Sequence, residues 1–370
     1  MKLIYLTSKR FPATTADHFF VKEMAKAFTK ILSKDFLLVV ADNTSDELKD
    51  ISYKSLELKA IRRLGIRYFV WLPYFIWKDG LNNIDTLFFS NDANLLSILI
   101  FWKKVFGLKY KIVSDWHMLF ENWRDRFVSK NSAKMITTTD HLKDLLVASS
   151  GVDNKDVLTA YGGVDLLKFD AVTESVSSLR NRLGLPVDAF IVGYIGFYKT
   201  MKMTKGLDTM INALSLIEDN NIKMVFVGGK PDEIEEYKLI AKNTGVADRI
   251  VFVPVVPADG MPAYEKAMDV LVIPYPDRPH FRKYGFPMKA YEYLASNRPV
   301  LYSNLPIMKE VLAGCAISFE PGSSQDLANK ILELKSNPNK GSELVMNASK
   351  KVVSCTWLER AKNIVEFVRG

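Results

Sequence analysis

A lysine and a glutamate one helical turn apart, Lys289 and Glu292, are the strongest candidates for chemistry in this chain of 370 residues. Pro287 suits the first position of a helix because its missing N–H would be unpaired there, and the residue pattern predicts a helix over 288–295. The start of such a helix attracts anions, and Lys289 adds a full positive charge. Together with Glu292, this arrangement suits a phosphate and a sugar hydroxyl. The alternative is an amphipathic helix on which Lys289 and Glu292 pair in solvent.

A lysine-rich loop follows the apolar run that opens the second half of the chain. That run predicts a buried strand, and it leads into Gly196, a loop with Lys199, Lys202 and Lys205, and a helix that begins at Gly206. Several lysines beside the start of a helix are typical of a phosphate-binding loop. The alternative is that these lysines are only solvated.

Polar side chains follow two predicted strands of the first half. Asp115 and His117 come directly after one strand, and Thr14, Thr15 and His18 lie between the first strand and the first helix. In open α/β sheets, ligands bind at the carboxyl ends of the strands, so we expect both groups to line a cleft. The alternative is that the histidines are structural and the threonines cap an ordinary helix.

A strand-loop-helix pattern occurs twice along the chain, with a polar junction near residue 170. Apolar runs predict strands over 2–7, 36–41, 55–58, 86–90, 110–114, 134–138, 157–160, 190–196, 224–227, 250–253, 270–273, 300–302 and 316–319. Two such patterns predict an α/β protein with two doubly wound, Rossmann-like domains that face each other across a cleft. We expect a first domain over 1–170, a second over 171–350 and a final helix within 351–370.

The composition is that of a soluble globular protein with an excess of positive charge. Apolar residues make up 48% and charged residues 25%, and the net charge is +8. This charge suits a nucleotide, an anionic lipid surface or a nucleic acid, but zinc-finger and RNP-type motifs are missing, so we expect no nucleic-acid partner. Cys315 and Cys355 predict neither a disulfide framework nor a metal site. Without a signal peptide or a transmembrane stretch, we expect a cytoplasmic protein.

Two segments of the first half are unusually rich in aromatic residues. Residues 64–77 are flanked by Arg62, Arg63 and Lys78, and residues 93–106 contain Lys103 and Lys104 in the last turn of a predicted helix. One interpretation is a pair of helices that lie in a membrane interface, with aromatic and basic anchors. We favour the other interpretation, in which both are crossover helices of the core and Pro73 kinks or breaks the first.

Three stretches resemble the signatures of family 4 retaining glycosyltransferases, also called glycosyl transferases group 1. Many members read Ser-Pro-Leu-Lys-x-x-Glu-Tyr-Met-Ala-x-Gly-Lys-Pro where this chain has residues 286–299. Residues 161–169 are similar to the family's Pro-Asn-Gly-Val-Asp-x-x-x-Phe, and Lys205-Gly206 matches its Lys-Gly. The resemblance covers nearly the full length. It implies the GT-B fold, in which the last helix crosses back onto the first domain.

The family resemblance implies a role for each site residue. Lys205 and Lys289 would bind the donor pyrophosphate, Glu292 the ribose, and His117 would face the donor sugar. The other donor-site positions implied by the family are Gly196, Gly206, Gly228, Val255, Val256, Tyr284, Gly285, Phe286, Pro287 and Met288. Tyr284 replaces the family's first glutamate and Phe197 its arginine, while Thr14, Thr15 and His18 would form the acceptor side.

The resemblance predicts a retaining glycosyltransferase that moves a sugar from a UDP- or GDP-sugar to a glycan, a lipid-linked acceptor or a cell-surface polysaccharide. We expect His117, Lys205 and Glu292 to carry the reaction, with no cofactor and no metal, since the chain has no Asp-x-Asp motif. A peripheral position on the inner face of the cell membrane would suit such acceptors. Two alternatives stay open: a sugar-nucleotide epimerase of the same fold, and a nucleotide-binding homologue that has lost catalysis.

Overall fold

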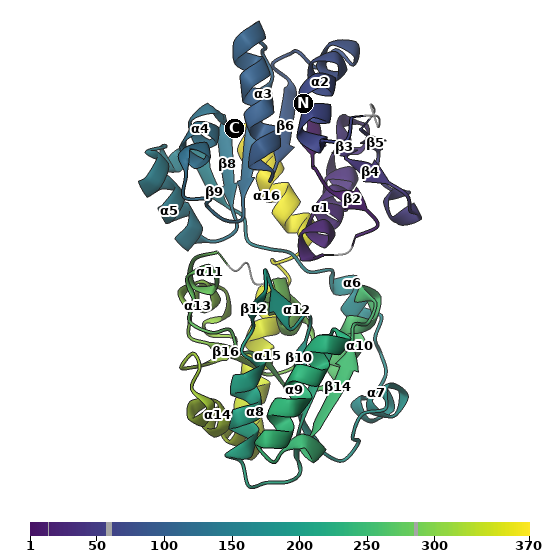
Figure 1. The fold of residues 1–370 in the computed structure, drawn as a ribbon, viewed down its shortest axis with the longest axis vertical. Helices are drawn as coiled ribbons and strands as arrows, with labels where there is room; N and C mark the ends of the chain where they lie inside the picture. The colour runs from purple at the N-terminus through teal and green to yellow at the C-terminus, as the bar shows by residue number, and fades with distance from the viewer. Residues whose placement is uncertain (14, 57–60, 285–287) are drawn as a thin grey trace. The chain divides into compact units, whose positions relative to one another are not determined.

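The protein forms two compact units, each built around one parallel sheet (Figure 1). The structure is a computed structural model, and it describes residues 1–13, 15–56, 61–284 and 288–370. The first unit contains Met1–Gly162 together with Trp357–Gly370, and the second contains Gly163–Thr356. The chain therefore leaves the first unit once and returns to it.

The first unit contains a seven-stranded sheet in which every neighbouring pair is parallel. The strand order is β5-β3-β1-β6-β7-β8-β9. These strands are β1 (Lys2–Leu6), β3 (Phe36–Val40), β5 (Tyr53–Ser55), β6 (Thr86–Ser90), β7 (Lys111–Trp116), β8 (Lys134–Thr137) and β9 (Val157–Thr159), and β2 (Arg10–Phe11) pairs separately with β4 (Asp42–Asn43). Successive strands are added on one side of β1 up to β5 and on the other side from β6 onward. This change of side between β1 and β6 is the switch point at which open α/β sheets bind ligands.

Six α-helices belong to the described residues of the first unit. They are α1 (Ala16–Leu32), α2 (Leu64–Lys78), α3 (Ala93–Phe106), α4 (Trp123–Asn131), α5 (Asp140–Ser150) and the C-terminal α16 (Trp357–Arg369). The last of these packs against α1, where the Phe20 and Trp357 rings meet edge to face with centroids 5.2 Å apart. The expected return of the C-terminal helix to the first domain is thus confirmed.

The second unit contains a six-stranded parallel sheet in the order β14-β13-β10-β15-β16-β17. Its strands are β10 (Phe190–Ile195), β13 (Ile222–Gly229), β14 (Ile250–Pro254), β15 (Val270–Ile273), β16 (Val300–Ser303) and β17 (Ile317–Phe319). A short antiparallel pair, β11 (Lys199–Thr200) and β12 (Met203–Thr204), lies between β10 and α8. Here the switch point, at which successive strands change from one side of the sheet to the other, lies between β10 and β15.

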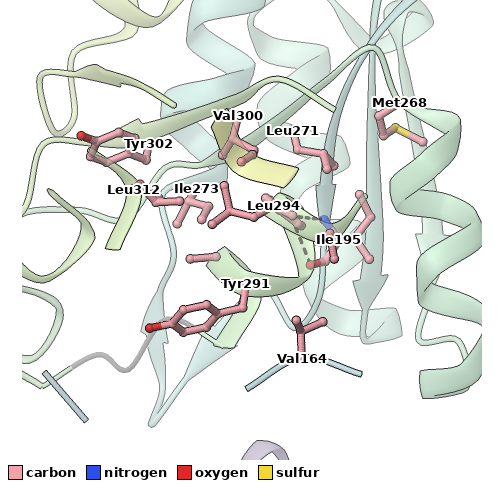
Figure 2. Close-up of a cluster of buried hydrophobic side chains, with 14 of the residues drawn as sticks. Val164, Ile195, Met268, Leu271, Ile273, Tyr291, Leu294, Val300, Tyr302 and Leu312 are labelled. Atoms are coloured by element: carbon pink, nitrogen blue, oxygen red, sulfur yellow. Dashed lines mark hydrogen bonds between the residues drawn. The ribbon is translucent and has the colours of Figure 1, made fainter. Parts of the chain in front are cut away.

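Helices cover both faces of the second sheet. They are α6 (Leu166–Asp170), α7 (Val176–Leu183), α8 (Leu207–Ser215), α9 (Pro231–Asn243), α10 (Met261–Ala267), α11 (Pro279–Lys283), α12 (Met288–Ala295), α13 (Pro306–Leu312), α14 (Ser324–Ser336) and α15 (Pro338–Val352). Successive residues of β10 enter opposite cores: Ile191 and Ile195 pack on one side, Val192 and Tyr194 on the other. Burial on both faces explains why these strands read as continuous apolar runs. Figure 2 shows part of the first core, with Ile195, Leu271, Tyr291 and Leu294.

Two strands and one helix, β7, β5 and α2, differ in detail from what the sequence predicts. The strand expected over 110–114 continues through Asp115 and Trp116, which are buried, so only His117 follows it. Pro73 neither breaks nor ends α2, although it removes one backbone donor. The carbonyl of Phe69, four residues earlier, instead accepts a hydrogen bond from Trp102 Nε1 of α3 at 2.9 Å. The strand predicted over 55–58 shares only Ser55 with β5, which begins two residues earlier, and residues 57–60 lie outside the described part of the chain.

Candidate active site

Two glycines bring the ends of β10 and β13 into direct backbone contact. Gly196 and Gly228 have φ angles of +132° and +103°, which L side chains rarely adopt. A Cβ on Gly228 would lie 2.8 Å from the Gly196 carbonyl, and the Gly196 N–H donates to Val227 O at 2.8 Å. This point lies beside the reversal between β10 and β15. The chain thus presents bare backbone where a ligand is expected to approach closely.

Lys289 of α12 extends over this glycine pair. A side chain at Gly196 would collide with the Lys289 ammonium, which also lies 4.7 Å from the centre of the Tyr194 ring and 5.4 Å from that of Tyr293. Burial lowers the pKa of Lys289, although Glu292 and Glu265 oppose that shift. Lys289 is buried, so the interpretation of a solvent-exposed pair with Glu292 is wrong.

The hydroxyl of Tyr293 fixes α12 to the end of β10. It accepts a hydrogen bond from the Ile195 N–H at 2.9 Å and approaches the Ile195 carbonyl at 3.3 Å. Tyr291 and Leu294 of the same helix are buried in the core that Figure 2 shows. Because these contacts hold α12 in the core directly after Lys289, the buried ammonium is positioned by the packing of the helix.

Lys205 reaches the same region from the start of α8. Its N–H donates to Tyr198 O at 3.1 Å, and Gly206 follows with a φ of +85°, where a side chain would collide with the Pro274 carbonyl. Burial and the nearby charge of Lys289 together lower the pKa of Lys205 to about 7, against the opposing effect of Glu233. The two ammonium groups are therefore close enough to repel each other.

His280 of α11 adds a third basic group to this cluster. Burial lowers the pKa of its imidazole, and the positive charge of Lys205 acts in the same direction. Lys205, Lys289 and His280 come from three different segments, and each is made harder to protonate by its surroundings. An anion with two or more charges would relieve this repulsion, as a phosphate or pyrophosphate does.

Two glutamates lie beside the basic cluster. Glu292 is half-buried one turn after Lys289, and burial raises its pKa against the opposing effects of Lys289 and Lys168. Glu265 of α10 is buried, and neither of its carboxylate oxygens has a hydrogen-bond partner among the described residues. Burial and the charge of Glu292 raise its pKa well above the ordinary value. The sequence analysis did not identify Glu265, since α10 resembles any amphipathic helix.

The other predicted donor-site residues occupy nearby loops and helix ends. Val255 is exposed and Val256 is partly buried, directly after β14. Tyr284 ends α11 with its N–H bonded to His280 O at 2.9 Å, and Met288 begins α12. Gly285, Phe286 and Pro287 lie outside the described residues.

The expected arginine position in the lysine-rich loop is occupied by Phe197. Its carbonyl accepts a hydrogen bond from the Tyr194 hydroxyl at 2.8 Å. Lys199 forms an ion pair with Glu236 at 2.5 Å, whereas Lys202 is exposed with a φ of +65°. Of the three lysines in this loop, only Lys205 therefore enters the cluster around Lys289.

His117 lies in the first unit, at the end of β7. Its Nε2 is 3.3 Å from Asp115 Oδ2, and its ring meets Phe20 at 4.3 Å between centroids. Arg360 of α16 donates from one nitrogen to both Asp115 oxygens, at 2.8 and 3.1 Å. Burial alone would raise the pKa of Asp115, but Arg360 and His117 lower it. The sequence analysis missed Arg360, which holds the carboxylate that in turn contacts His117.

The predicted acceptor-side residues lie at the start of α1. Thr15 is the residue before the helix, and its hydroxyl is 2.5 Å from His18 Nδ1 and donates to Asp17 at 2.5 Å. Burial lowers the pKa of His18, while Asp17 opposes that shift. The Phe11 and His18 rings meet edge to face at 6.0 Å. Thr14 lies outside the described residues.

The second unit matches a known protein family. Residues 189–337 match the family described as Glycosyl transferases group 1. This segment belongs to the group 1 glycosyltransferases. It contains every predicted donor-site residue, including Lys205, Lys289 and Glu292.

Relatives with named activities support the same family. A D-inositol 3-phosphate glycosyltransferase of Xylanimonas cellulosilytica is 30% identical over 35% of this chain and 35% of its own. A 2-deoxystreptamine glucosyltransferase of Streptomyces kanamyceticus is 28% identical over 40% of this chain and 38% of its own. The chain thus spans little more than a third of the length of these curated relatives.

Solved structures extend the similarity to the whole chain. Anabaena HepE, solved with UDP and glucose, is similar with a TM-score of 0.76 over 100% of both chains, at 17% identity. At this identity the likeness concerns the fold alone. Two doubly wound units, with α16 on the first, are the components of the GT-B fold, which confirms the fold predicted from the sequence.

Proposed function

We propose that this group 1 glycosyltransferase chain transfers a sugar from a nucleoside diphosphate sugar, with retention of configuration. The observation that carries the proposal is the basic cluster of Lys205, Lys289 and His280 beside the bare backbone of Gly196 and Gly228. Positive charges with lowered pKa values gain most from a bound dianion, because the anion removes their mutual repulsion. A pyrophosphate supplies that charge in both the substrate and the leaving group.

Lys205 and Lys289 would act on the leaving group. As the bond between the anomeric carbon and the phosphate oxygen breaks, negative charge grows on the diphosphate, and preorganised cations stabilise it. The acceptor hydroxyl forms the new bond on the same face, and its proton passes to the departing phosphate oxygen. Such a step requires neither a cofactor nor a metal. The structure gives each lysine a fixed position through Tyr293 and Gly206.

The remaining donor contacts follow from the family resemblance. Glu292 would accept hydrogen bonds from the ribose hydroxyls, and the backbone at Val255 and Val256 would meet the base. Tyr284, Met288 and the intervening Gly285, Phe286 and Pro287 would surround the sugar. The backbone at Gly196, Gly206 and Gly228, which carries no side chains, would approach the diphosphate.

In the first unit, His117 would contact the transferred sugar, with Asp115 and Arg360 as positioning residues. Thr14, Thr15 and His18 would contact the acceptor. We propose a glycan, a lipid-linked acceptor or a cell-surface polysaccharide in the cytoplasm or at the inner membrane face. The named relatives act on two different acceptors, so the acceptor class does not rest on them. UDP is the first donor base to test because HepE was solved with UDP.

Thermal stabilisation by nucleotides tests the donor site. A ligand that binds only the folded protein raises its melting temperature. We expect one nucleotide among UDP, GDP and ADP, either alone or as its sugar conjugate, to raise the melting temperature by several degrees. Glu292→Ala should reduce that shift, whereas the surface control Glu343→Ala should retain it. If no nucleotide stabilises the protein, or if both variants respond like the parent, the donor-site assignment is wrong.

Turnover then separates transfer from the related activities. Release of nucleoside diphosphate that requires an acceptor supports the transferase. Conversion of the sugar nucleotide without any acceptor would instead indicate an epimerase. Binding without turnover across a broad panel of donors and acceptors would indicate a homologue without catalysis, which Tyr284 and Phe197 at two donor-site positions make worth testing.

A further inference from the structure

The outward sides of α2 and α3 form a surface of large apolar side chains, called here the aromatic face. The opposite sides of both helices are buried in the first unit, as expected for core crossover helices. The exposed members of the aromatic face are Ile66, Phe69, Val70, Tyr74 and Trp77 of α2 and Phe101, Val105 and Phe106 of α3. Trp77 is 78% exposed and Phe106 is 59% exposed. Figure 1 shows α2 and α3 side by side within the first unit.

The aromatic face is held together by ordered contacts. The Phe69 ring lies 4.7 Å from Trp102 and 5.3 Å from Phe101, and Trp102 stacks on Phe106 at 5.2 Å between centroids. Trp102 also donates to the Phe69 carbonyl that Pro73 leaves without its helical partner. The carbonyl that Pro73 leaves free thus joins the two helices through this hydrogen bond. The side chains of the aromatic face therefore contact one another in fixed positions, and both helices are well packed on their buried sides.

The charged side chains on the two helices of the aromatic face have one sign, and Asp79, which follows α2, is paired with Lys54. Arg62, Arg63, Lys78 and Lys104 are exposed, and the Lys78 ammonium lies 5.3 Å from the centre of the Tyr74 ring. Residues 62–78 and 93–106 contain no aspartate or glutamate. A partner for this face must therefore offer apolar contact in its centre and negative charge at its edge. Lipids with acidic headgroups combine both properties.

We infer that the aromatic face binds the surface of an anionic lipid bilayer. Neither helix can cross the bilayer, because α2 has 15 residues and α3 has 14, while a spanning helix needs about 20. Across the described residues, no helix is long and apolar enough to form a span. The helices would lie in the interface, with Trp77 and Phe106 among the acyl chains and the basic side chains at the headgroups. A second copy of this chain fits less well, since pairing two such faces would bring like charges together.

This inference does not depend on the proposed activity. It needs neither the donor site nor an acceptor, and every residue that carries it belongs to the first unit. The inference also reconciles the two interpretations of the aromatic segments: their buried sides are core, and their exposed sides are free to meet a membrane.

Vesicle co-sedimentation of the full chain tests the inference. We expect the protein to sediment with vesicles of phosphatidylcholine mixed with phosphatidylglycerol, and to stay in solution with phosphatidylcholine alone. The double variant Trp77→Ala/Phe106→Ala should weaken binding at least about tenfold, because two large apolar side chains leave the interface. The control Leu239→Ala/Val353→Ala, which removes two exposed apolar side chains of the second unit, should bind like the parent.

A charge variant gives a second measurement that does not touch the aromatic rings. Lys78→Gln/Lys104→Gln should weaken binding to the anionic vesicles roughly 25-fold, since each basic residue near the surface contributes about fivefold. Lys242→Gln/Lys350→Gln makes the same change in net charge on exposed residues of the second unit and should have little effect. Added salt should weaken the parent and this control alike.

Two results would overturn the inference. One is equal binding to neutral and anionic vesicles, or none to either, by a parent protein that is folded in a thermal melt. The other is a parent that forms dimers without lipid and a Trp77→Ala/Phe106→Ala variant that is monomeric, which would make the aromatic face an interface between copies. If that variant fails to fold, the lysine variant decides the question.

Discussion

The two charged clusters of this protein differ in how their charges are balanced. In the first unit, Asp115 and Arg360 are both buried, and their opposite charges balance each other at 2.8 Å. In the second, burial depresses the pKa values of Lys205, Lys289 and His280. A neighbouring lysine adds to the shift of Lys205 and of His280, whereas Glu292 and Glu265 oppose that of Lys289. A balanced pair needs no ligand, whereas an unbalanced cluster is completed by one. The comparison therefore assigns positioning to the first cluster and anion binding to the second.

The largest expected effect comes from breaking the balanced pair. Arg360→Met leaves the Asp115 carboxylate buried and unpaired, which should lower the free energy of unfolding by about 3–5 kcal/mol. Chemical denaturation of the full chain measures this change. Arg360→Met/Asp115→Asn should recover part of the loss because it also removes the uncompensated charge. Arg182→Met, which breaks the exposed pair with Glu174, is the control and should cause no measurable change. A single variant as stable as the parent would contradict the role of the pair.

Removing a cation from the unbalanced cluster should weaken nucleotide binding without lowering the free energy of unfolding. Lys289→Met should weaken nucleotide binding by about 10- to 100-fold, as expected for losing a hydrogen bond to a charged group. Its free energy of unfolding should be unchanged or higher, because the cost of burying the ammonium outweighs the attraction of Glu292 and Glu265, as its lowered pKa indicates. Titration calorimetry and a melt measure the two quantities, with the exposed Lys309→Met as the control. A variant that binds like the parent but unfolds more easily would make Lys289 structural.

The pH dependence of nucleotide binding should report on Lys205. Its folded pKa of about 7 lies below the ordinary lysine value, so the ammonium loses its proton as pH rises through 7. A bound diphosphate favours the charged form, and affinity should fall by up to about tenfold per pH unit above 7. Stability without ligand should change in the other direction, rising between pH 7 and the unfolded lysine value, because the unfolded state then binds more protons. Lys205→Arg should keep its charge and flatten both profiles.

The smallest expected effect concerns Glu265. Its folded pKa is raised, so this carboxyl contributes stability at low pH that is lost as pH rises above the ordinary glutamate value. Glu265→Gln should remove that dependence and leave the melting temperature at neutral pH equal or slightly higher. Melts of both proteins across the acidic to neutral range measure it. A clear loss of stability at neutral pH would show that the charged carboxylate has a stabilising partner in the folded protein.

The sequence predicted the fold well because buried parallel strands leave a strong local signal. The strands from β1 to β17 that build the two sheets were expected within a few residues, since nearly all are short apolar runs, and β5 (Tyr-Lys-Ser) is the exception that was displaced. Helices such as α4 and α15 were not predicted. Their buried residues are few, so the apolar pattern of each is weak. Here tertiary contacts decide what the sequence pattern leaves open.

The candidate site was predictable only where its residues belong to a continuous motif. Lys205, Lys289 and Glu292 stand in recognisable segments, and the structure places both lysines in one cluster. Arg360 is 245 positions from Asp115, and no local pattern connects them. Glu265 likewise becomes notable only because α10 brings it near Glu292. Burial of Lys289 depends on the packing of α12, which residue spacing does not reveal.

The return of α16 to the first unit has a consequence for how this protein is made. All other segments of that unit precede Gly163, but Arg360 is synthesised only after the whole second unit. At about 5–20 residues per second, the ribosome needs roughly 10–40 s to cover this interval. During that time Asp115 lacks its guanidinium partner and the α1 surface around Phe20 is uncovered. We therefore expect the nascent first unit to stay incompletely folded during this interval. Chaperones that bind exposed apolar surface can bind it in that time.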